Sequence, residues 1–342
     1  MAATPTAVAY NFCSTRAEVI SAIATLSLHA YAVLDCEGRE LGTSQGALSL
    51  LCLGTPIVPD CPQVIYIIDI PAIRHDSGSV AALSTFLADP TIIKVVWDGR
   101  MDAIELYETL AADMGTVLDL QIAEIFGRPM IHAYPERKRL ERLANSGFGY
   151  SVIRKRDALF ESLDAVIGMQ RCLEDLELDF GVRKDTEVVE MHRSGQSSRW
   201  MERPLSPTLL QYAAGDIIMI AHLFAHFCEK KYIQVAGGAS VNTLLGSSHR
   251  YVYRHGKRGR IEKDGEFRPK ALLVPSALYA LPGPKATCEA CQYILPLLCF
   301  QFDRRQRKSQ HRCRVCEALV LKKELKREHY KGQKSIPKGK KR

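Results

Sequence analysis

The chain has 342 residues, 46% hydrophobic and 25% charged, which suffices for one full-sized domain and a smaller module. It contains no run of about 18 apolar residues, so we expect no membrane-spanning helix and no membrane partner. The net charge of +8 is unevenly spread, because residues 301–342 hold 16 Lys and Arg against 4 Asp and Glu, which leaves the rest at −4. A basic tail of this kind favours a polyanionic partner such as nucleic acid, with a merely solvated tail as the alternative.

Short apolar runs predict three consecutive strands in the first part of the chain: Tyr31–Asp35, Ala47–Leu53 and Val64–Asp69. The pattern then alternates, and it predicts a helix near Val80–Ala88, a strand at Ile92–Val96, a helix from Met101 to about Ala112 and a short strand that ends at Asp119. Strands followed by alternating elements predict an α/β fold in which helices cover a sheet.

The second half of the chain is less regular. Residues 135–205 are polar around a predicted helix at Arg156–Leu178, and Ser206-Pro207 is a typical N-cap with proline at the first helical position, opening a helix through about Cys228. Beyond residue 237, Gly, Ser, Pro and basic residues predict no long helix. We therefore expect a folded domain at residues 8–232, a linker or extended segment at 233–284, a cysteine-containing module at 285–330 and a basic disordered tail at 331–342.

Acidic residues occur in three separate motifs. Asp35 and Glu37 are two apart at the end of an apolar strand, so both carboxylates point to the same face. Asp102 falls in the first turn of the helix that follows the strand Ile92–Val96, and Tyr212 and Asp216 are four apart on one helix. Each motif alone has an ordinary explanation, such as a solvated strand end or a favourable acid near a helix N-terminus.

Together, the three motifs suit a site for two divalent metal ions. Such ions need several carboxylates to neutralise them while leaving positions for water and phosphate oxygens. Without metal, clustered carboxylates repel one another and raise one another's pKa values, so they make poor structural elements.

These motifs resemble those of the DEDD 3′–5′ exonucleases: Asp-x-Glu, then an Asp after a Lys-Val strand, then Tyr-x-x-x-Asp. The stretch Trp200-Met201-Glu202-Arg203-Pro204-Leu205 is similar to the ribonuclease D branch. The resemblance covers roughly residues 8–230 and implies a ribonuclease H-like α/β fold, with a mixed sheet flanked by helices. It also implies that Asp35, Glu37, Asp102 and Asp216 hold two Mg²⁺ or Mn²⁺ ions for 3′–5′ hydrolysis of single-stranded RNA or DNA to nucleoside 5′-monophosphates.

The tyrosine subclass fits better than the histidine subclass, which places His at position 211, here Gln211. Tyr212 is then the residue expected to orient the attacking water. Two features depart from the branch: Trp97 stands where it often has His, and no helical nucleic-acid-binding domain is predicted after residue 232. The segment around Trp97 resembles relatives of the Egalitarian type, some of which are RNA-binding adaptors that lost catalytic acids, so an adaptor with little activity is the alternative.

Two cysteine pairs stand close together near the C-terminus. Cys288 and Cys291, and Cys313 and Cys316, form two CxxC motifs separated by 21 residues, which is typical of a four-sulfur structural Zn²⁺ ribbon. Between them an apolar strand leads into a basic turn with Arg304, Arg305, Arg307 and Lys308. These four cations are expected to bind phosphates, with the alternative that the apolar strand merely docks the ribbon on the main domain.

The remaining cysteines and histidines carry no spacing signal. Lone His192 and His311 are expected to make ordinary polar contacts. The chain opens without a basic leader and apolar segment, which favours a cytoplasmic or nuclear protein. The scattered cysteines are accordingly expected to be reduced and mostly buried thiols: Cys13, Cys36, Cys52, Cys61, Cys172, Cys228 and Cys299.

Overall fold

The computed structural model describes the chain except residues 1–6, 59–61, 234–238, 254–271, 304–307 and 335–342. The chain divides into two compact units. Unit 1 comprises Met1–Gly127 and Ile167–Pro269, and unit 2 comprises Arg128–Val166 and Lys270–Arg342. The sequence had placed residues 128–166 in the first domain, whereas the structure groups them with the C-terminal part.

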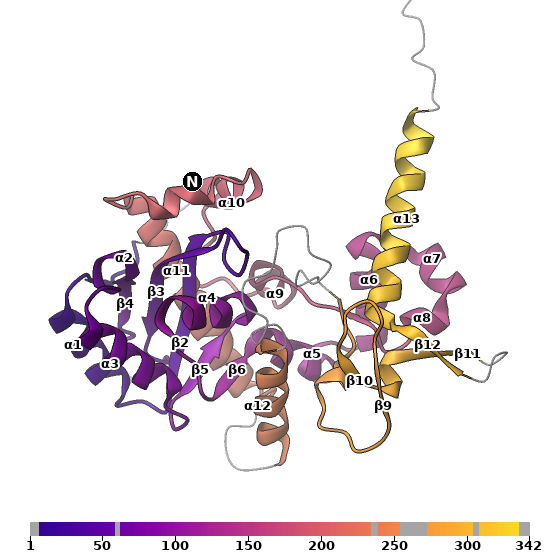
Figure 1. Ribbon diagram of the computed structural model, residues 1–342, viewed down its shortest axis with the longest axis horizontal. Coiled ribbons are helices and arrows are strands. Elements are labelled where there is room, and N and C mark those ends of the chain that lie inside the picture. The colour runs from indigo at the N-terminus through magenta and orange to yellow at the C-terminus, as the bar shows by residue number, and fades with distance from the viewer. Residues whose placement is uncertain (1–6, 59–61, 234–238, 254–271, 304–307, 335–342) are drawn as a thin grey trace, which may run out of the picture. The chain divides into compact units, whose positions relative to one another are not determined.

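Unit 1 contains a six-stranded mixed sheet in the order β1-β4-β3-β2-β5-β6 (Figure 1). The strands β2, β3 and β4 form the predicted antiparallel meander, β5 and β6 extend it in parallel beside β2, and β1, which the sequence analysis missed, pairs in parallel with β4. The bounds are β1 Asn11–Cys13, β2 Tyr31–Arg39, β3 Ala47–Gly54, β4 Ile65–Asp69, β5 Ile93–Val96 and β6 Val117–Asp119.

Helices pack around this sheet, in agreement with the predicted fold class. They are α1 Arg16–Leu26, α2 Ile70–Ile73, α3 Ser77–Ala88, α4 Arg100–Leu110, α5 Leu120–Ile131, α9 Met169–Asp175, α10 Thr186–Arg193, the short 3₁₀ helix Ser197–Met201, α11 Pro207–Glu229 and α12 Ala239–Val252. The last four residues of α5 belong to unit 2.

Helix α11 is the central helix of unit 1. As predicted, it begins after the N-cap Ser206, whose hydroxyl accepts a hydrogen bond from the Leu209 amide at 3.3 Å. By length and composition α11 could cross a membrane, but 61% of its apolar window is buried inside the protein, as in a core helix. A Cβ on Gly54 of β3 would lie 2.5 Å from Ile217 Cγ2, so glycine allows α11 to approach the sheet closely.

The predicted helix at Arg156–Leu178 is wrong. The structure has instead two short helices, α8 Asp157–Phe160 and α9 Met169–Asp175, with the strand β7 Asp164–Ala165 between them. Ser162 has a φ of 57°, which interrupts any helix there, and Asp164 and Ala165 pair with β8 Leu272–Leu273.

Two predictions for the C-terminal half also need correction. Helix α12 lies inside the expected linker, where its buried Leu244, Tyr251 and Val252 give it a packed face. Helix α13, Arg314–Lys334, runs past residue 331, where a disordered tail was expected to begin, because the sequence there is rich in the helix formers Leu, Lys and Glu.

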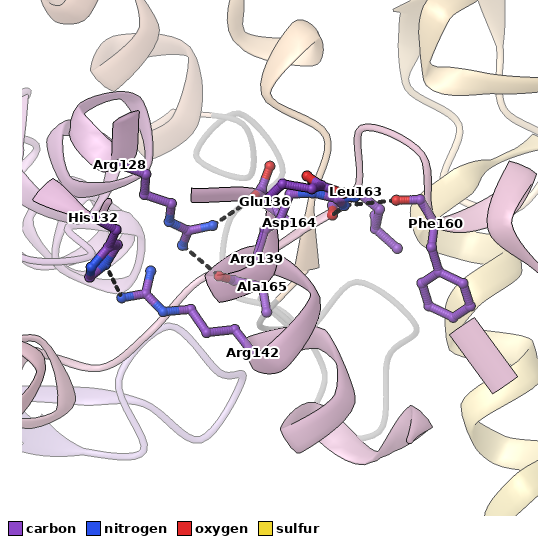
Figure 2. A network of polar contacts seen from close by, with 9 residues as sticks. All are labelled: Arg128, His132, Glu136, Arg139, Arg142, Phe160, Leu163, Asp164 and Ala165. Carbon is purple, nitrogen blue, oxygen red and sulfur yellow. Dashed lines mark hydrogen bonds and ion pairs between the residues drawn. The ribbon is translucent and has the colours of Figure 1, made fainter. Parts of the chain in front are cut away.

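Unit 2 combines short helices with small hairpins. Its further elements are α6 Pro135–Leu143, a turn at Ala144–Phe148, α7 Tyr150–Lys155, β9 Lys285–Thr287, β10 Ile294–Pro296, β11 Phe300–Asp303 and β12 Lys308–Cys313. Two arginines hold its first segment together: the buried Arg128 pairs with Asp164 and donates to the Ala165 carbonyl at 2.8 Å, and the half-buried Arg139 donates to the carbonyls of Phe160 and Leu163 (Figure 2).

Candidate functional site

The first acidic pair lies on β2, an interior strand of the sheet. Asp35 and Glu37 point to one face, while Cys36 between them is buried in the apolar core on the other. The strand bulges between Glu37 and Gly38, where a Cβ would lie 2.2 Å from the Ala47 carbonyl oxygen, so this close approach requires glycine.

Helix α11 brings the third motif to this pair. Carboxylate oxygens of Asp35, Glu37 and Asp216 all lie within 4.8 Å of one another, although they come from positions 181 residues apart along the chain. Tyr212, one helical turn before Asp216, lies on the same face of α11.

As the sequence predicted, Asp102 lies in the first turn of α4. Its side chain is buried. It is not one of the three clustered carboxylates. Burial and the charge of Asp35 raise the pKa of Asp102 well above its ordinary value, so these two acids are near enough to interact electrostatically.

A second buried acid, Asp119 at the end of β6, positions the start of α4. Its carboxylate accepts hydrogen bonds from the amides of Asp98 at 3.2 Å and Gly99 at 3.0 Å, the turn directly before α4. Asp98 there adopts a φ of 60°, and its carboxylate pairs with Arg100. The sequence analysis used Asp119 only to mark the end of a strand.

Helix α12 braces the same turn. The guanidinium of Arg100 lies 4.4 Å from the centre of the Tyr251 ring, and the Tyr251 hydroxyl donates to Gln121 Oε1 at 2.6 Å. Ser248 accepts from the Asp119 amide at 3.1 Å. The segment that the sequence suggested was a linker therefore supports the element that carries Asp102.

Lys184 is a site residue that the sequence analysis missed. Its ammonium group lies 2.6 Å from Asp216 Oδ2 and 3.1 Å from the Tyr212 hydroxyl. Lys184 precedes α10 in an irregular segment, 28 residues before Tyr212, and no spacing or periodicity indicates the contact.

The electrostatics of the acids follow from their clustering. Burial and the charge of Asp216 raise the pKa of Asp35 to about 7, with Lys184 opposing the shift. Burial and the charge of Asp35 raise the pKa of Glu37 well above its usual range. Burial also raises the pKa of Tyr212, so its phenol keeps its proton at neutral pH.

The residues of this site suit a divalent cation. Within the described parts of the chain, the buried Asp216 Oδ1 has no hydrogen-bond partner. A buried carboxylate oxygen without a donor is costly unless a cation or water satisfies it. Three convergent carboxylates, one of which has this unpaired oxygen, are a donor set that Mg²⁺ or Mn²⁺ prefers.

The Trp-x-x-Arg-Pro-Leu stretch, residues 200–205, makes polar and aromatic contacts around the site. Arg203 makes a bidentate pair with Asp69 at the end of β4 and donates to the Trp200 carbonyl at 2.9 Å. The buried Trp200 donates its indole N–H to His192 at 3.3 Å, and its ring centre lies 6.3 Å from that of Tyr212. His192 thus makes a polar contact, as expected, in the vicinity of Tyr212. The indole nitrogen of Trp97 has no hydrogen-bond partner among the described residues.

The two cysteine pairs form a second cluster, in unit 2. The four Sγ atoms of Cys288, Cys291, Cys313 and Cys316 lie within 4.8 Å of one another. The Cys313 amide donates to Cys288 Sγ at 3.2 Å, and hydrogen bonds from the neighbouring thiols hold the pKa of Cys291 well below its usual range. Four converging sulfurs suit a tetrahedral Zn²⁺ site.

The other predicted residues fall into three groups. Arg304, Arg305 and Arg307 lie outside the described residues, and of Lys308 only the backbone, in β12, is described. His311 pairs with Glu289 at 3.1 Å. Among the described residues the scattered cysteines form no disulfide, and all are buried except the half-buried Cys228; Cys61 lies outside the described residues.

Part of the chain matches a known protein family. Residues 10–157 match the family model for the 3′–5′ exonuclease domain, which spans the first two acidic motifs, whereas Tyr212 and Asp216 lie beyond the match. No curated protein matches the sequence.

Solved structures share the fold. Ribonuclease D of Trypanosoma brucei is 20% identical with a TM-score of 0.55, over 84% of this chain and 94% of that one. The complex of that enzyme with RNA U12 is 20% identical with a TM-score of 0.54, over 83% of each chain. The chain described here therefore has the fold of ribonuclease D, and its residues 10–157 match a 3′–5′ exonuclease domain.

Proposed function

We propose that the chain is a metal-dependent exonuclease of the DEDDy class that removes nucleotides from the 3′ end of single-stranded nucleic acid, with RNA favoured over DNA. The observation that carries the proposal is the convergence of Asp35, Glu37 and Asp216, from β2 and α11, on one region within 4.8 Å. The nuclease family match supports the reaction class, and the T. brucei relative with RNA U12 supports RNA as the substrate.

In this proposal Asp35, Glu37, Asp102 and Asp216 hold two Mg²⁺ or Mn²⁺ ions. Such ions lower the pKa of bound water and stabilise the charge that develops on the phosphate. Tyr212 orients the attacking water by hydrogen bonding, since burial raises the pKa of its phenol and makes it a poor base. Lys184 holds the Tyr212 hydroxyl and one oxygen of Asp216 in place. The products are nucleoside 5′-monophosphates.

We also propose that the four cysteines of unit 2 hold one structural Zn²⁺ ion, because the four sulfurs leave no open coordination position for catalysis. Arg314, directly after Cys313, donates to the carbonyls of Ala158 and Leu159 in α8. The ion would then fix the base of α13 against the helices of residues 135–160.

The test is a degradation assay with the purified chain and matched 5′-labelled RNA and DNA strands, each with a free or a blocked 3′ end. Stepwise shortening from a free 3′ end, only in the presence of Mg²⁺ or Mn²⁺, is the expected result. Tight binding of RNA without any metal-dependent product would contradict hydrolysis and favour the RNA-binding adaptor.

A further inference from the structure

The two compact units carry charges of opposite sign. Unit 2 has 26 Lys and Arg against 10 Asp and Glu and is therefore net +16, whereas unit 1 is net −8. The basic tail accounts for most of this difference, but residues 128–166, which the sequence assigned to the first domain, add eight further Lys and Arg to unit 2.

Some of these eight cations are structural. Arg128 and Arg139 are occupied by Asp164 and by carbonyl groups of residues 160–165, and Arg142 lies 3.3 Å from the His132 ring nitrogen (Figure 2). Arg128 holds the end of α5 against β7, and Arg139 holds α6 against the end of α8 and the residues that follow it. Their contacts do not depend on any partner.

Another group of cations faces solvent. Arg154, Lys155 and Arg156 are consecutive exposed residues at the end of α7, and within the described chain no carboxylate pairs with them. Tyr150, at the start of α7, is 49% exposed and shares a helix face with Arg154. On α6 and the residue before it, Tyr134 is 67% exposed and the Arg137 guanidinium lies 5.1 Å from its ring centre.

We propose that this set of exposed residues in unit 2, called the α6–α7 face, binds single-stranded nucleic acid: Tyr134, Arg137, Tyr150, Arg154, Lys155 and Arg156. The inference rests on the proposed function for the choice of partner. Proteins that bind single strands combine cations along the backbone with exposed aromatic rings on which bases stack. An acidic protein would account for the cations but not for the two exposed tyrosines beside them.

The packing of unit 2 keeps this face in place. Helix α6 contacts α7, and α13 packs against both α8 and the turn Ala144–Phe148. The ammonium of Lys322 in α13 lies 5.7 Å from the Phe148 ring centre. The face therefore belongs to the same packed unit as the cysteine cluster.

The test measures binding of the full chain to a labelled, 3′-blocked oligouridylate of about 20 nucleotides without added Mg²⁺ or Mn²⁺ and without a chelator. No cleavage occurs under these conditions, and the Zn²⁺ proposed for unit 2 stays in place. Replacing three phosphate-binding cations in R154Q/K155Q/R156Q should make the slope of log affinity against log salt less steep by about 2. The ratio of wild-type to variant affinity should therefore fall roughly 20-fold between about 50 and 200 mM salt. Tyr150→Ala should weaken binding about fivefold or more without changing that slope, because it removes stacking and no charge.

The matched control is R74Q/K230Q/K231Q, which removes three exposed cations from unit 1 and should leave binding unchanged. The proposal would be overturned if the α7 triple variant kept the wild-type affinity and salt slope. It would also be overturned if polyglutamate displaced the RNA as effectively as unlabelled oligouridylate does, because that result identifies an acidic protein as the partner. Hydrolysis is scored separately with Mn²⁺ and an unblocked dinucleotide, so a failure of the nuclease proposal leaves the binding result for the 3′-blocked strand interpretable.

Discussion

The ammonium group of Lys184 lies 2.6 Å from Asp216 Oδ2, inside a cluster of carboxylates. Burial lowers the pKa of Lys184, but the nearby charge of Asp216 and the Tyr212 hydroxyl outweigh it and raise that pKa above its ordinary value. The positive charge of Lys184 thus offsets part of the electrostatic repulsion among the clustered carboxylates.

Lys184→Met should destabilise the metal-free protein by about 2 kcal/mol, or roughly 4–8 °C in Tm, because Asp216 loses its charged hydrogen-bond partner. Added Mn²⁺ should raise the Tm of this variant more than that of the wild type, because the metal supplies the missing positive charge. Thermal denaturation with and without Mn²⁺ measures both effects.

The control is Arg183→Met, which removes the neighbouring cation. Arg183 pairs with Asp179 on the surface and its side chain is 77% exposed. Equal Mn²⁺-induced shifts in the Lys184 variant and in this control would show that Lys184 does not interact with the metal site.

Asp35 should make the stability of the metal-free protein depend on pH. Its pKa is raised from 3.8 to about 7 by burial and by Asp216, so the folded state binds more protons than the unfolded state between those values. The contribution of Asp35 to stability is therefore present below about pH 4 and is lost as pH rises to about 7.

Asp35→Asn removes this titration, so the Tm of the variant relative to wild type should increase steadily from pH 5 to pH 7 in EDTA. Distant carboxylates titrate equally in both proteins and cancel in the difference. Glu37 and Asp102 lose the charge of Asp35, which raises their pKa values in the wild type, so they change the difference in the same direction. A constant difference across this range would show that the pKa of Asp35 is not raised.

Much of the site was predictable because its signals are local. Asp35 and Glu37 follow from strand alternation, and Ser206-Pro207 fixes the start of the helix that carries Tyr212 and Asp216. Lys184 and Asp119 were not predictable in this way, because their contacts join segments that only tertiary packing brings together.

The same distinction explains the errors in the fold. The predicted helix after Arg156 fails at Ser162, whose left-handed backbone no periodicity announces, and the pairing of β7 with β8 joins residues more than 100 positions apart. The packed face of α12 has few apolar residues, so its composition suggested a linker.

Tyr212→Phe should lower kcat by about 100-fold with little change in KM, because the phenol orients water without binding the substrate's distant parts. Burial raises the pKa of Tyr212, so the pH–rate profiles of wild type and variant should run parallel from about pH 6 to 9. If the wild-type pH–rate profile had a sloping limb that was missing from the profile of the variant, Tyr212 would instead be the group that titrates.

The cysteine cluster should contain about one Zn²⁺ per chain, and Cys288→Ser should abolish it. Elemental analysis measures the metal, and limited proteolysis should show faster cleavage of unit 2 in this variant. The control is Cys299→Ser, a buried thiol in the same unit outside the cluster. Loss of zinc from the control, or its retention in Cys288→Ser, contradicts the assignment.

The most direct test of the site compares rates of 3′-end degradation with saturating Mn²⁺ for Asp35→Asn, Asp102→Asn and Asp216→Asn. The control is Glu108→Gln, an exposed acid on the same helix as Asp102. We expect each of the three variants to lose at least about 10³-fold in rate while the control keeps wild-type activity. Degradation by Asp35→Asn or Asp216→Asn at the wild-type rate would contradict the account.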